Sequence, residues 1–427
     1  MSVDCSEAHA RHLDATDALA DMRANYALPA GASGAALAYL SGHSLGLAPR
    51  TARTRVDEEL RDWEQLGVLG HEHAHRPWIG YAEQLQPDLA MLTGARAHEV
   101  VAMNSLTVNL HLLLASFYRP TAQRQRILVE AGAFPSDRHV VTSQLRWHGH
   151  DPAQQLIEIA PRRGEDLLRM EDIQQHIAEA GNSLALVLWP GVQYRTGQAF
   201  DMPAITRAAH AAGALVCLDL AHAIGNLPLS LHDWQVDCAA WCSYKYLNAG
   251  PGALGGAFIH ELGLQHRDVP RLEGWWGHDV TSRFAMSPDF VPGAGAAAWQ
   301  LSNPPILSAA PLLASLADFR RAGMSALRAK SIQLTAYLQQ LLEARCGDSL
   351  QLVTSSSAAD RGCQLSVRVR GSPRRACAVF EALLPHGVVG DWREPDIIRL
   401  APVPMYNSYH DAWRAADALT AVLAVII

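Results

Sequence analysis

The chain has 427 residues, of which 49% are hydrophobic and 18% charged, and its formal net charge is −7. This composition is typical of a globular protein with a large core and excludes a disordered chain. The acidic balance argues against a nucleic-acid binder, because no surplus of basic residues is available to neutralise phosphates. The polar N-terminus predicts no signal peptide, and the longest apolar run, TAVLAVII, is too short for a membrane span. Seven scattered cysteines predict reduced thiols and a cytoplasmic protein.

The first three hundred residues predict an alternation of strands and helices. A helical pattern over about 7–25 precedes a short strand in ALAYL. Beyond residue 51, four continuous apolar runs predict strands: RILVE (126–130), ALVLWP (185–190), GALVCLDL (213–220) and DCAAWCSY (237–244). Helical patterns such as MPAITRAAHAAG separate them, which favours βαβ units and a mostly parallel sheet. Runs without polar alternation are typical of strands covered on both faces.

The pattern changes after SNPPILSAAP. A long amphipathic stretch covers about 312–344, with Gly323 as a candidate break. It is followed by a strand in QLSVRVRG, a helix in CAVFEALLPHG, a strand in IIRLAPV and a last helix from about Tyr409. We therefore predict an α/β protein with a large domain over 51–310 and a smaller α+β domain formed by 1–50 and 311–427.

Three short motifs resemble known functional patterns. GHSLG (42–46) matches the nucleophile elbow of serine hydrolases, with Ser44 as nucleophile, but it precedes nearly all the predicted sheet strands. HEHAH (71–75) matches the zinc motif H-E-x-x-H, but flanking glycines and a proline leave little room for the helix that this motif needs. GPGALG (250–255) matches G-x-G-x-x-G without the strand–turn–helix setting of a dinucleotide site. We expect turns or extended segments there, and no metal site.

A carboxylate and a lysine stand at the ends of two successive predicted strands. Asp219 ends one apolar run, and Lys245 follows the next run about 26 residues later, roughly one βαβ step on. Ligands of open α/β sheets bind at the carboxyl ends of strands. A buried Asp219 needs a cationic partner, which a protonated pyridine nitrogen supplies, and a lysine amine forms imines. Taken alone, Asp219 would be interpreted as a helix cap or turn residue, and Lys245 as a solvent-exposed surface lysine. Together with Tyr244 and the glycine-rich bend they favour a pyridoxal phosphate (PLP) site.

Long motifs spread over nearly the whole chain carry a family resemblance. They are YLSGHSLGL (39–47), GHEHAHRPW (70–78), NSLTVNLHLLLASFYRPT (104–121), AFPSD (133–137), GVQYRTGQ (191–198), DLAHAIGN (219–226), LHDWQVDCAAWCSYKYLNAGPG (231–252), GWWGH (274–278), SNPPI (302–306) and IRLAPVPMYNSYHD (398–411). In this order and at this length they resemble kynureninase, a family of PLP-dependent hydrolases. The resemblance implies the fold type I of PLP-dependent transferases, that of aspartate aminotransferase.

The resemblance implies a role for each matched residue. Lys245 corresponds to the Schiff-base lysine, and Asp219 to the partner of the pyridine nitrogen. Tyr244 corresponds to a phosphate-binding tyrosine and is the candidate to polarise the substrate carbonyl or to move a proton. The other implied cofactor contacts are Leu106 and Thr107 at the phosphate, Phe134 on the pyridine face, Asp137 in the same loop, His222 close by, and Trp275 and Asn303, which are expected to reach in from the partner of a homodimer.

The implied reaction is hydrolysis of kynurenine between its β and γ carbons, giving L-alanine and anthranilate or its 3-hydroxy analogue. Arg399 matches the arginine that binds the α-carboxylate, which a guanidinium can hold with two hydrogen bonds. His71, Ser302 and Asn303 resemble the form of the family that prefers 3-hydroxykynurenine, because these side chains can hydrogen-bond the extra hydroxyl. Whether the enzyme serves tryptophan catabolism or NAD biosynthesis in the kynurenine pathway is left open.

Two positions depart from the family pattern. His43 stands where asparagine is usual, and Pro190 stands where a hydroxyl residue often helps to bind the cofactor, although proline offers neither hydroxyl nor N–H. The alternatives are another fold type I PLP enzyme, a PLP-binding protein without activity, and a serine hydrolase using Ser44. A cysteine desulfurase would need a nucleophilic cysteine in a mobile loop, for which Cys363 is the remaining candidate.

Overall fold

The computed structural model describes residues 4–265 and 269–426. Its largest sheet has seven strands in the order β2-β8-β7-β6-β5-β3-β4. Their bounds are β2 Val100–Ala102, β3 Arg126–Glu130, β4 Leu156–Ile159, β5 Leu184–Pro190, β6 Leu215–Asp219, β7 Cys238–Cys242 and β8 Gly255–Ile259. Strands β3 to β7 pair in parallel, whereas β8 is antiparallel to both of its neighbours. The predicted mostly parallel sheet is therefore confirmed, and β3, β5, β6 and β7 fall on the four predicted runs.

Apolar clusters cover both faces of this sheet. Within β7, Ala239 and Trp241 belong to one cluster, and Cys238 and Ala240 to the other. The first cluster includes side chains of α8 and α9, and the second includes side chains of α5 and α6. This explains the unbroken apolar runs, since each alternate residue meets a helix-covered face. The helices of this region are α2 Arg50–Leu66, α3 Gly70–His73, α4 Gln86–Thr93, α5 Leu106–Phe117, α6 Pro135–Trp147, α7 Pro152–Gln155, α8 Met170–Ala180, α9 Met202–Ala211, α10 Glu261–Gln265 and α11 Ile306–Ala322.

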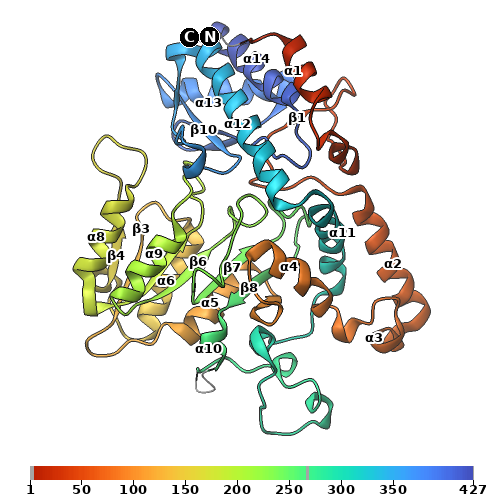
Figure 1. Ribbon diagram of the computed structural model, residues 1–427, viewed down its shortest axis with the longest axis vertical. Helices are drawn as coiled ribbons and strands as arrows, with labels where there is room; N and C mark the ends of the chain where they lie inside the picture. Colours follow the sequence, from red (N-terminus) through yellow and green to blue (C-terminus); the bar gives the residue numbers. More distant parts are fainter. Residues whose placement is uncertain (1–3, 266–268, 427) are drawn as a thin grey trace.

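A second, antiparallel sheet has the order β12-β13-β10-β9. Its strands are β9 Leu350–Leu352, β10 Leu365–Val369, β12 Asp391–Arg393 and β13 Ile397–Leu400, and its helices are α12 Met324–Cys346, α13 Pro373–Leu383 and α14 Tyr409–Val425. The N-terminal segment joins this part of the molecule. Helix α1 (Glu7–Ala15) packs on α14, and β1 (Ala38–Tyr39) pairs in parallel with β11 (Val388–Val389). Figure 1 shows α1 and α14 together at this end of the molecule.

Several local predictions can be compared with the structure. Gly323 separates α11 from α12 with a φ of +74°, and α14 begins at Tyr409, both as predicted. The helical pattern over 7–25 corresponds to α1 and a 3-10 helix, Ala20–Asn25. The predicted βαβ step between Asp219 and Lys245 is wrong, because residues 220–237 form turns and no α-helix. In the described residues no helix combines the length and the apolar character that crossing a membrane requires.

The predicted division of the chain into two domains remains a prediction. Helix α11 lies on both sides of the predicted boundary at residue 310, and it packs mainly against α2. The two sheets themselves have separate apolar clusters, since the side chains of β9, β10 and β13 pack with α12, α13 and α14.

The turn after β1, which we call the junction turn (residues 41–46), touches both sheets. Ser41 forms a parallel bridge with Ala401, directly after β13. At the other end of the turn, the N–H of Gly46 donates a 2.8 Å hydrogen bond to the carbonyl of Tyr244. A Cβ on Gly46 would lie 2.3 Å from the carbonyl oxygen of Lys245, so glycine alone permits this approach. The junction turn therefore connects the strand of the smaller sheet with the loop after β7.

Candidate active site

The carboxyl edge of the large sheet carries a polar cavity of about 190 Å³. Three strands end at it, with Glu130 of β3, Pro190 of β5 and Asp219 of β6 in its wall. Eight of the residues predicted to bind the cofactor line the same cavity, namely Leu106, Thr107, Phe134, Asp137, Asp219, His222, Tyr244 and Lys245. The prediction that this edge brings Asp219 and Lys245 together is confirmed.

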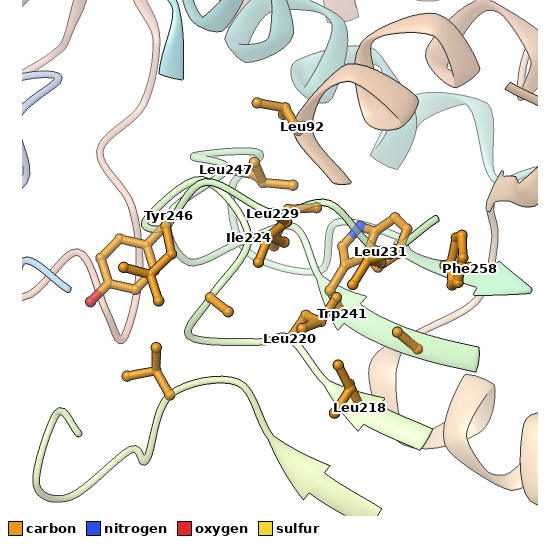
Figure 2. Close-up of a cluster of buried hydrophobic side chains, with 14 of the residues drawn as sticks. Leu92, Leu218, Leu220, Ile224, Leu229, Leu231, Trp241, Tyr246, Leu247 and Phe258 are labelled. Atoms are coloured by element: carbon orange, nitrogen blue, oxygen red, sulfur yellow. The ribbon is translucent and has the colours of Figure 1, made fainter. Parts of the chain in front are cut away.

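Lys245 is held by its two successors in sequence. Tyr246 and Leu247 are buried in the core next to the sheet, where Figure 2 shows them together with Leu220 and Trp241. This anchoring fixes the loop and leaves the lysine side chain in the cavity. Its Nζ lies 5.7 Å from the centre of the Phe134 ring. The amine and the aromatic ring thus face each other within the cavity.

Two buried carboxyl groups, Asp137 in the first turn of α6 and Asp219 at the end of β6, lie close to each other. Burial raises the pKa of both, and the neighbouring Asp219 raises the pKa of Asp137 further. At Asp219 the nearby Lys245 opposes this rise, as does the N–H of Ala221, which donates a 2.7 Å hydrogen bond. Asp219 is therefore the carboxyl that ionises more readily. A protonated pyridine nitrogen fits this position, because it brings the positive charge that a buried carboxylate requires.

The start of α5 provides a region of the cavity that favours negative charge, in contrast to the two carboxyl groups. Ser105 precedes the helix without a side-chain hydrogen bond to it, so the first N–H groups of α5 have no acceptor from this cap, and Ser105, Leu106 and Thr107 line the cavity. Such a helix start binds phosphate through its N–H groups and its dipole. Burial raises the pKa of Tyr244, so its hydroxyl stays protonated and can donate to an anion. The residues of the cavity therefore fit both ends of PLP.

Glu130 is a buried acid that the sequence analysis did not select. Its Oε2 has no hydrogen-bond partner among the described residues. Burial raises the pKa of Glu130 to about 7, although the neighbouring Gln193 amide lowers it. The available signal was its place at the end of the apolar run RILVE, equivalent to that of Asp219. Pro190 lies in the same wall of the cavity. It offers no hydrogen-bond donor there, as expected for a proline in place of the family's hydroxyl residue.

Arg399 is buried close to the cavity, with only 1% of its side chain exposed. Its Nε donates to Asp391, which lies directly opposite on β12, and its Nη1 donates to the carbonyl of Tyr194. Burial lowers the pKa of Arg399 to about 10, although Asp391 opposes this shift. Tyr194 lines the cavity and packs its ring edge-on against Phe134 at 5.2 Å. Tyr194 and Asp391 were missed by sequence reasoning, although Tyr194 follows a strand end and so belongs to the expected edge.

Four predicted site residues lie away from Lys245. His71, Trp275 and Asn303 line a separate depression of about 420 Å³, which shares no lining residue with the polar cavity. Ser302 is exposed beside Asn303 and lines neither. Within one chain, these residues are therefore not brought to Lys245.

The rival motifs do not form the sites that their patterns suggested. Both ring nitrogens of His43 lack a hydrogen-bond partner in the described residues, so the neighbouring Ser44 has no His43 base. Helix α3 ends at His73, so His71 and His75 do not share a helix, as predicted. Cys363 is fully buried, and burial raises the pKa of its thiol to about 12, which does not suit a nucleophile on a mobile loop.

The buried Glu130 generates a pH-dependent prediction. Its pKa is about 7 in the folded protein and near 4.5 when exposed, so the folded state binds the proton more tightly. The free energy of unfolding should then fall as the pH rises through this interval and stay low above it. We expect Glu130→Gln to stabilise the protein by roughly 1–3 kcal/mol at about pH 8 and by much less at about pH 5, measured by urea unfolding.

The matched control is Glu64→Gln on the exposed face of α2, which should change stability little at either pH. An equal effect of Glu130→Gln at both pH values would contradict the buried-acid interpretation.

Solved structures show the same fold. A variant of the C-DES protein with glycine covalently linked to its PLP cofactor has a TM-score of 0.77 at 19% identity, covering 92% of this chain and 97% of that one. The cysteine desulfurase CsdA from Escherichia coli has a TM-score of 0.76 at 17% identity, covering 96% and 99%. At these identities the likeness concerns the fold, and it confirms the predicted fold type I architecture.

Sequence comparisons identify the family. The model of the Kynureninase C-terminal domain matches residues 327–419. A protein named Kynureninase from Xanthomonas euvesicatoria pv. vesicatoria (strain 85-10) is 56% identical over 420 residues, covering 96% of this chain and 99% of that one. Another from Xanthomonas axonopodis pv. citri (strain 306) is 55% identical over 425 residues, covering 97% and 100%. This chain belongs to the kynureninase family, and it is a PLP-dependent hydrolase of carbon–carbon bonds.

Proposed function

We propose that this enzyme cleaves L-kynurenine, and preferentially L-3-hydroxykynurenine, between the β and γ carbons. The products are L-alanine and anthranilate or 3-hydroxyanthranilate. The observation that carries the proposal is the convergence of Lys245, the Asp137–Asp219 pair and the start of α5 on one cavity, with the buried Arg399 beside it. The names of the Xanthomonas relatives support it. A cytoplasmic location remains a prediction from the sequence.

We assign roles to the chain's own residues as part of this proposal. Bound PLP supplies an electron sink for negative charge at the substrate α-carbon. With the cofactor bound, Asp219 would keep the ring nitrogen protonated, Phe134 would pack against the ring, and the amine of Lys245 would move the α-proton. Arg399 binds the α-carboxylate. Tyr244, whose hydroxyl is protonated, donates to the phosphate or to the carbonyl oxygen to which water adds.

We also propose a homodimer with shared active sites. The depression that holds His71, Trp275 and Asn303 is bordered by exposed apolar side chains, including Leu69 and Phe284. A cluster of exposed aromatic and aliphatic groups is typical of a protein–protein interface. In a twofold dimer this surface of one chain would complete the cavity of the other. His71 and Asn303 would then face the substrate's aromatic ring, with Ser302 nearby.

The first prediction concerns the covalent link between cofactor and lysine. The chain contains two lysines, and the second, Lys330, forms a buried 2.7 Å ion pair with Asp17. Borohydride reduction of the PLP-loaded enzyme should label Lys245 alone, as read by peptide mass mapping. Lys245→Ala should abolish the label and lower kcat by roughly a hundredfold to ten-thousandfold, because the proton-transferring amine is lost.

Lys330→Arg is the control, since it keeps the ion pair and should label like the wild type. Label on Lys330, or a fully active Lys245→Ala enzyme, would overturn the assignment of the cavity.

The second prediction concerns substrate preference. The kcat/KM of the wild type should be at least about tenfold higher for 3-hydroxykynurenine than for kynurenine, because polar groups placed for the hydroxyl are left unpaired without it. His71→Leu should reduce this ratio mainly by lowering kcat/KM for the hydroxylated substrate. A wild type that prefers plain kynurenine would contradict this proposal and leave the cleavage reaction itself standing.

The third prediction tests the shared site by complementation. Lys245→Ala chains and His71→Ala/Asn303→Ala chains should each have low activity. When the two are unfolded, mixed and refolded together, activity should rise toward roughly one quarter of the wild-type value, because half of the dimers then carry one intact site. Each variant refolded alone is the control. Absence of recovery in a mixture that sediments as a dimer would refute a site made from two chains.

A further inference from the structure

His43 is a buried side chain whose hydrogen-bonding groups are unused within the described residues. Its side chain has no exposed surface, and neither Nδ1 nor Nε2 has a partner there. Leaving such a group unpaired lowers the stability of the folded protein. Within the described residues nothing satisfies this imidazole, so a partner for it would have to come from outside them.

The position of His43 indicates where that partner lies. His43 belongs to the junction turn, which is tied at Ser41 to the end of β13 and at Gly46 to the loop of Lys245. Its ring centre is 6.3 Å from that of His222, which lines the cofactor cavity. His43 thus lies between the cofactor site and the strand that carries Arg399.

The charges around His43 favour a neutral imidazole and an anionic ligand. Burial lowers its pKa well below the usual value, and the positive charges of Arg399, Arg393 and Lys245 lower it further. His222, the ring nearest to it, has a lowered pKa for the same reasons. A neutral imidazole has one N–H donor and one acceptor nitrogen. Because three cations already act on this site, the neutral donor can serve a carboxylate without adding another charge.

Arg399 leaves room for such a second donor. Its Nε and Nη1 are engaged with Asp391 and with the Tyr194 carbonyl. Its Nη2 lies 2.6 Å from Asp391 but is not aligned for a hydrogen bond. A carboxylate that binds Nη2 therefore still has lone pairs available for a neighbouring N–H.

We infer that His43 is a substrate-positioning residue that donates a hydrogen bond from its imidazole N–H to the α-carboxylate of the amino-acid substrate, beside Arg399. This inference rests on the proposed function and deepens it. It gives the chain's histidine the same donor capacity that an asparagine amide would have at this position. Removal of the donor should therefore weaken binding of the amino-acid half of the ligand and leave the aryl half unaffected.

The test compares His43→Leu with His43→Asn in the PLP-loaded enzyme. His43→Leu should raise the KM for kynurenine about 10- to 100-fold with a smaller change in kcat, as expected for a lost hydrogen bond to a charged group. His43→Asn should stay within about threefold of the wild type, because the amide still donates. The Kd of L-alanine, read from the visible absorption of the bound cofactor, should rise by the same factor as KM in the leucine variant. Inhibition by anthranilate, which lacks the amino-acid half, should be unchanged.

The melting temperature distinguishes the proposed role of His43 from a merely structural one. His43→Leu should not lower the melting temperature of the ligand-free enzyme, because it removes two unpaired polar atoms. The control is His260→Leu, a buried histidine whose Nδ1 accepts from the N–H of Leu262 and whose Nε2 contacts the carbonyl of His232. This control should lose stability and keep the wild-type KM.

Failure of the proposed function and failure of the inference about His43 give different results. If the wild type does not cleave kynurenine, the proposed function is wrong, yet L-alanine binding still reports on His43. If the wild type is active and His43→Leu keeps the wild-type KM and L-alanine affinity, the inference is wrong and the proposed function stands.

Discussion

The burial of Asp219 at the end of β6 is the constraint on which the site depends. A carboxylate in that position is costly unless a cation is close, and the nearby carboxyl of Asp137 increases the cost. Lys245 supplies part of the compensation, and it does so because Tyr246 and Leu247 are fixed in the core. The parallel order of β5, β6 and β7 then places these groups at one edge of the sheet. The chemistry of the site follows from this electrostatic demand rather than from any single motif.

The sequence predicted the parts of the fold in which one physical signal dominates. Continuous apolar runs indicated β3, β5, β6 and β7 because both faces of these strands are covered. Strand β8 (Gly255–Ile259) was not predicted, since its two glycines have low strand propensity and its pairing with β2 and β7 is not visible in the sequence. The helix predicted between β6 and β7 is absent, because turns that pack against the core connect these two strands in place of the usual crossover helix.

The candidate site was predictable to a similar extent. Asp219 and Lys245 could be chosen as a pair from their strand ends, together with Tyr244 and the glycine-rich bend, whereas most of the other contacts required the family resemblance. Glu130 and Tyr194 stand at or just after strand ends and so belong to the expected edge, but the sequence did not show that they line the cavity. The position of His71 gives no indication of a role within its own chain, and in the proposed dimer the groups that it would serve belong to the other chain. Sequence patterns report local structure and do not show such an assembly.

The pairing of β1 with β11 has a consequence for the order in which the protein can be built. Ala38 lies beside Val388, so the partner of this early strand is synthesised about 350 residues later. The junction turn follows β1 directly, and it closes against the backbone of Lys245. During translation the large sheet can form while β1 is still unpaired, since contacts of high sequence separation form late. The active site therefore becomes complete only when almost the whole chain has left the ribosome, and shortening either end of the chain would damage the same wall of it.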